Sequence, residues 1–142
     1  MTPEPDLLRR QRATTATMLC FRRKQFAWRA GIHCVRLAAF HLKAMGHRVP
    51  TVPRVRSALA ARRELAHRGF ASVSELMDSL VPRRPAPAFM RLGDVAAVAG
   101  VGGMDALFIC AGPQKLIGWR EDAEAMVNLD VSLDEIDTVW EV

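Results

Sequence analysis

The sequence predicts an α+β domain in which helices come first and strands follow. Apolar residues recur at helical spacing up to about residue 80, and after Phe89 the chain changes to short apolar runs separated by glycines. The 142 residues, 50% of them hydrophobic and 25% charged, have the size and composition of one globular domain. Because the strands do not alternate with helices, the pattern favours an antiparallel sheet over a parallel βαβ sheet.

Four helices are predicted in the first part of the chain. Apolar stripes, prolines and glycines place them at about residues 5–24, 33–45, 55–68 and 72–80. The last of them begins with Ser72 and Glu75 in the spacing of a capping box. The second helix is apolar over most of its length, so we expect it to be buried in the core.

Five short strands are predicted in the second part of the chain. They cover about residues 95–99, 105–111, 115–120, 125–131 and 138–142, with glycines at several of the turns. Short strands joined by tight turns indicate an antiparallel meander. We therefore expect N-terminal helices packed on a C-terminal antiparallel sheet or partial barrel.

Charge and hydropathy narrow the classes of partner. The net charge is +5, with most arginines before residue 92 and an acidic stretch at residues 121–141. Arginine-rich helices can bind nucleic acid or simply face water. Prolines separate the candidate helices of a helix-turn-helix, so we do not expect a nucleic-acid partner.

The sequence contains no run of 18 apolar residues, so no membrane span is predicted. The N-terminus lacks the apolar core of a signal peptide. We expect synthesis and folding in a cytoplasm.

Cysteine and histidine spacing predicts neither a disulfide framework nor a metal or cofactor site. The three cysteines and four histidines do not cluster at ligand spacing. We expect the histidines to be helix-surface or capping residues, and the tryptophans to belong to the core or to an interface. These residues are His33, His41, His47, His67, Trp28, Trp119 and Trp140.

Cys34 is the candidate site residue. It stands at the predicted start of the second helix, after a loop that carries Phe26, Trp28 and Gly31. A thiol at a helix N-terminus can have a lowered pKa, which favours the nucleophilic thiolate. The competing interpretation, which we favour, is that Cys34 packs as a small apolar residue, as we also expect for Cys20 and Cys110.

The order of these features resembles the NlpC-type cell-wall peptidases, which have a papain-like fold. The matching pieces are the aromatic-glycine loop before Cys34, a Gly-Asp strand at residues 93–95 and a second strand at residues 107–112. The closing residues 139–142, Val-Trp-Glu-Val, are similar to the last strand of phage-borne relatives. The resemblance covers about residues 25–142 and leaves the helix within residues 1–24 outside it, as a docking element.

The departures from the family pattern concern the catalytic groups. His33 stands where the relatives carry an acidic residue, and Ala106 stands where their catalytic histidine begins its strand. Cysteine peptidases need a base that takes the thiol proton and passes it to the leaving amine. No histidine follows His67, and His41 is two helical turns from Cys34. Cys34 is therefore interpreted as a vestigial nucleophile position in a degenerate branch of the family.

The resemblance implies a structural or assembly component of the tail tip or baseplate of a bacteriophage or phage-like particle. Its partners would be other tail proteins, with further copies of the chain as an open alternative, and its location would be the virion. An exposed apolar stripe on residues 5–24 would support the docking function, and we expect the ancestral groove to be filled. The alternative is a cysteine peptidase or amidase that acts on peptidoglycan with Cys34 as nucleophile and an unconventional base, either His33 or a histidine of a partner chain.

Overall fold

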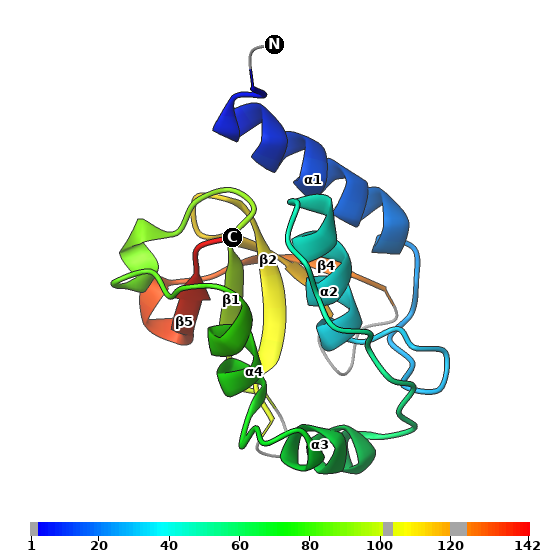
Figure 1. The fold of residues 1–142 in the computed structure, drawn as a ribbon. Coiled ribbons are helices and arrows are strands. Elements are labelled where there is room, and N and C mark those ends of the chain that lie inside the picture. The colour runs from blue at the N-terminus through cyan, green and yellow to red at the C-terminus, as the bar shows by residue number, and fades with distance from the viewer. Residues whose placement is uncertain (1–2, 101–103, 120–124) are drawn as a thin grey trace.

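The predicted α+β class is confirmed by the computed structural model, which describes residues 3–100, 104–119 and 125–142 (Figure 1). Within these residues the helices come first and a five-stranded sheet follows. The α-helices are α1 (Asp6–Phe21), α2 (Cys34–Ala44), α3 (Ala58–His67) and α4 (Val73–Leu80). Each begins and ends within a few residues of its predicted bounds.

Side chains cap three of the helices at their N-termini. His33, Ser57 and Ser72 accept hydrogen bonds from main-chain N–H groups in the first turns of α2, α3 and α4. At α4 the Glu75 N–H donates to Ser72 Oγ as the predicted capping box requires, but the Glu75 carboxylate accepts from the Ala71 N–H, one residue before the capping residue. These caps satisfy donors that a helix end leaves without partners.

The sheet is antiparallel throughout, in the order β4-β3-β2-β1-β5. Its strands are β1 (Val95–Val98), β2 (Ala106–Gly112), β3 (Lys115–Gly118), β4 (Val127–Asp130) and β5 (Ile136–Trp140). The first four strands form the predicted meander, but the prediction is wrong for the fifth. β5 returns across the sheet and pairs with β1, so that Trp140 lies opposite Val95.

The position of β5 follows from burial. Trp140 has no exposed surface, whereas alternate residues of β4 are exposed. A strand next to β4 would place this large indole at the rim of the sheet, and a strand next to β1 places it in the core. Residues 82–84 continue the sheet beyond β5, because Arg84 N–H donates to Val139 O and Glu141 N–H donates to Pro82 O.

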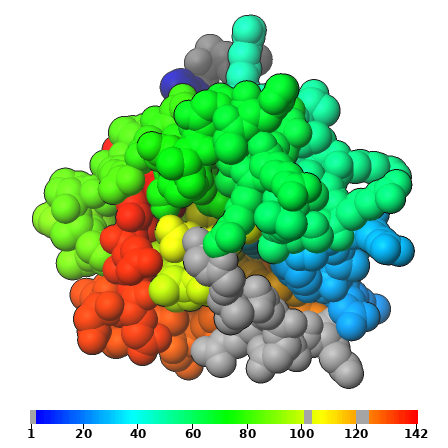
Figure 2. Space-filling model, turned by 90° about the horizontal axis from the view of Figure 1, so that it is seen from below, coloured from blue at the N-terminus to red at the C-terminus, as the bar shows by residue number. Residues whose placement is uncertain are grey.

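The core lies mainly between the helices and one face of the sheet. Leu37 and Leu42 of α2 pack there with Leu107 and Ile109 of β2. The opposite face carries a smaller cluster that includes Phe108, Leu116 and Val139. α1 lies across α2, as Figure 1 shows, and buries Ala13 and Thr17. α3 stands away from the sheet, next to α4 (Figures 1 and 2).

No helix within the described residues is long and apolar enough to cross a membrane. The predicted absence of a membrane-spanning helix therefore holds for that part of the chain.

Candidate functional site

A tight loop delivers Cys34 to the start of α2. Ala27 and Ile32 pair as an isolated antiparallel bridge, with N–H to O distances of 2.8 and 3.0 Å in the two directions. Gly31 closes this loop with φ of 73°, a conformation that residues with a side chain rarely adopt. The loop ends at His33, and the helix begins at Cys34, as the sequence predicts.

His33 is the capping residue of α2 and is almost fully buried, with 2% of its surface exposed. Its Nδ1 accepts a hydrogen bond from Arg36 N–H at 3.3 Å, and its ring stacks on Trp28 with centroids 5.0 Å apart. Burial, and to a smaller extent the charge of Arg36, lowers the pKa of His33 to about 4. The ring is therefore neutral at pH 7.

The Cys34 thiol faces the start of β2. Its residue is partly exposed, but burial raises the pKa of the thiol above its usual value. The main-chain N–H groups of Leu107, Cys34 and Val35 interact with the sulfur and act in the opposite direction. Leu107 is the second residue of β2, so the fold brings Cys34 next to the strand end that begins with Ala106.

No described side chain forms a hydrogen bond with the Cys34 sulfur, and two of the nearby titratable groups, His41 and Asp105, have other partners. His41 Nδ1 lies 2.8 Å from Thr17 Oγ1, and its Nε2 lies 2.7 Å from Gly93 O. Asp105, which precedes Ala106, accepts a hydrogen bond from the Ser74 hydroxyl at 3.1 Å. Cys34 thus has the helix end of a cysteine nucleophile without a side-chain partner that would take its proton.

The expectation that every histidine is a surface or capping residue is wrong for His41. This ring has no exposed surface and joins α1, α2 and the turn before β1 through its two hydrogen bonds. Burial lowers its pKa to about 4. Of the other residues that were expected to pack, Trp119, Trp140 and Cys110 are buried, whereas Trp28 and Cys20 are partly exposed.

Sequence reasoning did not identify the ion-pair network around Asp94. This carboxylate has no exposed surface and pairs with Arg10 at 2.9 Å and with Arg84 at 2.9 Å. It also accepts hydrogen bonds from the N–H groups of Arg91 and Val142. The only signal in the sequence is an acidic residue directly before an apolar strand. The network holds four distant segments together and is structural.

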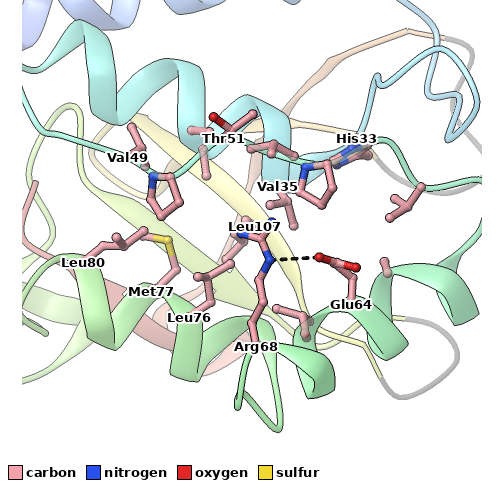
Figure 3. Close-up of a pocket in the computed structure, with 18 of the residues that line it drawn as sticks. His33, Val35, Val49, Thr51, Glu64, Arg68, Leu76, Met77, Leu80 and Leu107 are labelled. Carbon is pink, nitrogen blue, oxygen red and sulfur yellow. Dashed lines mark hydrogen bonds and ion pairs between the residues drawn. The ribbon is translucent and has the colours of Figure 1, made fainter.

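An apolar pocket of about 80 Å³ lies beside α2, between that helix and α3 and α4 (Figure 3). Val35, Ala38 and Leu42 of α2 contribute to one wall, and Leu65 and Met77 to the opposite one. His33 and Leu107 also line the pocket, but Cys34 does not. Across the described residues, no group of three His, Cys, Asp or Glu side chains is arranged to hold a metal ion.

Comparison with known protein families gives one match. The model of a family described as a domain of unknown function, DUF6950, matches residues 7–142. The chain belongs to this family. No curated protein matches the sequence. The matched region includes most of α1, which is part of the same core as α2.

Proposed function

We propose that this member of the DUF6950 family is a degenerate NlpC-type, papain-like domain that serves as a structural or assembly component of a phage or phage-like tail tip or baseplate. In this proposal the cysteine-peptidase chemistry has been lost and the fold has been kept. The proteins it contacts are other tail proteins, and its location is the virion.

The observation that carries the proposal is the environment of Cys34. The sulfur lies at the N-terminus of a core helix and against Leu107, next to the strand position at which the resemblance places the catalytic histidine. Ala106 occupies that position; alanine has no group that can take a proton, and its side chain packs on the face of the sheet opposite α2. The raised thiol pKa further reduces the fraction of thiolate at neutral pH.

The surface of α1 supports a function in assembly. One side of this helix is buried, but Leu7, Leu8 and Leu19 remain 53–60% exposed. Leu8 and Leu19 are eleven residues apart, which places them on the same face of the helix. Arg12 and Thr15 are exposed on the face between these two leucines, so the helix presents separate apolar side chains and not the expected continuous stripe. Exposed leucines on a helix can still contact a partner protein.

The second candidate is a cysteine peptidase or amidase that acts on peptidoglycan, with Cys34 as nucleophile. The main-chain N–H groups around the sulfur favour this candidate, because they stabilise a thiolate. It needs a base from outside the described contacts, such as a histidine of a partner protein.

Two assays separate the candidates. Purified peptidoglycan is incubated with the protein and with Cys34→Ala, and soluble fragments are measured. We expect no release of fragments by either protein. Release that disappears in Cys34→Ala contradicts the proposal and establishes the peptidase.

The second assay tests assembly. In a particle-producing host, deletion of the coding sequence should yield particles without complete tail tips in electron micrographs. Intact tails without the protein would also contradict the proposal.

A further inference from the structure

The pocket beside α2 has the size of one side-chain site. Its volume of about 80 Å³ is far below the roughly 300–1,000 Å³ of clefts that hold drug-sized ligands or cofactors. Its lining is apolar except for His33, Thr51, Glu64 and Arg68, and the last two form a salt bridge at 2.9 Å (Figure 3). A single aliphatic side chain matches this volume and this lining.

His33 adds one unused hydrogen-bond donor to the wall of the pocket. Its Nδ1 accepts the Arg36 N–H, so a neutral imidazole must carry its proton on Nε2. Nε2 is buried and has no hydrogen-bond partner. A buried donor without a partner is costly, and a bound group with an acceptor oxygen would remove that cost.

A segment without regular secondary structure, residues 48–56, borders the pocket, and Val49, Val52, Pro53 and Val55 are among the lining residues. Figure 3 shows Val49 at the pocket. Residues 48–56 form no main-chain hydrogen bond with another described residue. Main-chain N–H and C=O groups without such partners can pair with an extended segment of another chain.

The outward side of the same segment is basic. Arg48, Arg54 and Arg56 are exposed, and none of them forms an ion pair with a described residue. Three guanidinium groups within nine residues favour a partner with carboxylates at matching positions.

We propose that the pocket and residues 48–56 together bind an extended acidic segment of a partner protein. One aliphatic side chain of that segment fills the pocket. A main-chain carbonyl next to that side chain accepts a hydrogen bond from His33 Nε2–H. The carboxylates of the segment pair with the exposed arginines. The inference rests on the proposed function, since an assembly protein acts through such partner segments, and it names the chemistry of one of them.

The test is an NMR titration of the ¹⁵N-labelled full chain with blocked peptides at low salt. The probes are acetyl-Asp-Glu-Leu-Glu-Asp-amide, the same peptide with alanine in place of leucine, and a leucine peptide flanked by lysines. We expect the acidic leucine peptide to shift amide signals of His33, α2 and residues 48–56. The alanine peptide should bind about tenfold more weakly, because most of the side-chain burial is lost.

Matched variants assign the binding to its three parts. Ala61→Met fills the pocket and should weaken binding about tenfold, whereas Ala58→Met, on the exposed start of the same helix, should not. His33→Ser keeps a helix cap but lacks the donor, and should weaken binding several-fold. The double variant Arg48→Gln/Arg54→Gln should weaken peptide binding. The control double variant Arg22→Gln/Arg23→Gln changes the net charge by the same amount and should weaken binding less.

Three results would overturn this inference. The leucine and alanine peptides could bind with equal affinity, the amide signals that shift could all belong to other surfaces, or the lysine peptide could bind tightly. None of these results bears on the peptidoglycan and particle assays, so the proposed function can stand while the inference fails. Hydrolysis of peptidoglycan would have the opposite meaning, because it contradicts the function without testing the pocket.

Discussion

At the scale of single residues, our proposal that cysteine-peptidase chemistry has been lost depends on Cys34 and Ala106. The fold brings the thiol to the end of β2 at which Ala106 stands, and main-chain N–H groups lie around the sulfur. Among the described residues, only main-chain groups form hydrogen bonds with that sulfur, so no side chain is placed to take its proton. The Ala106 side chain packs with Phe108 on the face of the sheet opposite α2, and it therefore points away from Cys34.

We therefore predict that Ala106→His by itself does not activate Cys34. Its imidazole lies on the face of the sheet away from the sulfur, so the rate of alkylation of Cys34 by iodoacetamide at pH 7 should stay unchanged. Mass spectrometry of the peptide that contains Cys34 separates this rate from those of Cys20 and Cys110, which are also free thiols.

The matched control for this substitution is Ala111→His, near the other end of β2. It should likewise leave the alkylation rate of Cys34 unchanged. A rate about tenfold or more higher in Ala106→His than in the unmodified protein, with both folded, would contradict this prediction and show that an imidazole at position 106 reaches the sulfur.

At the scale of secondary-structure elements, Asp94 connects α1, the proline-rich connector and the C-terminal residues to the sheet. Arg10 reaches it from α1 and also donates to Val142 O and Leu92 O, while Arg84 reaches it from the connector. α1 therefore has two sides in different environments. The buried side stabilises the domain, and Leu8 and Leu19 are exposed on the side that we propose for docking.

The corresponding prediction is that Asp94→Asn lowers the free energy of unfolding by about 3–5 kcal/mol, because two arginines keep their buried charge and lose its counter-ion. Urea unfolding at pH 7.5 measures the change. Glu4→Gln makes the same chemical change in the exposed pair with Arg12 and should have no measurable effect. A loss as small as that of the control would show that Asp94 does not hold these elements together.

At the scale of the whole molecule, two buried neutral histidines make stability depend on pH. Burial is the main cause for both rings and lowers each pKa to about 4. The charge of Arg36 also lowers the pKa of His33. For His41, Arg10 and His47 lower the pKa and Asp94 raises it. In the unfolded chain both rings have a pKa of about 6.5. As the pH falls, the unfolded state therefore binds protons at a higher pH than the folded state does, and unfolding becomes more favourable.

We predict that stability is complete above pH 6.5 and decreases as the pH falls toward 4, by about 3 kcal/mol for each histidine. Urea unfolding at pH 7.5 and pH 4.5 measures the difference. His41→Gln should reduce the pH dependence by roughly half, because one of the two titrating groups is removed. The same free energy of unfolding at both pH values would refute the prediction.

The sequence by itself determined the elements of this protein, because their signals are local. Apolar spacing, prolines and glycines are read within a few residues, and they predict the four helices and the approximate positions of the strands. The cap at Ser72 and the position of Cys34 at a helix start are local in the same sense. For the candidate site, the resemblance placed Cys34 and the strand that begins at Ala106 in one site; in the structure Cys34 lies against Leu107 of that strand, and the catalytic interpretation of the pair remains a proposal.

Only the tertiary structure decided what depends on residues far apart in the chain. The pairing of β5 with β1 depends on where the core can accept Trp140. The burial of His41 depends on Thr17 and Gly93, 24 and 52 residues away, and the ion pair of Asp94 with Arg10 spans 84 residues. Local patterns carry no information about such partners, since whether a polar group is exposed or buried is decided by the segments that pack around it.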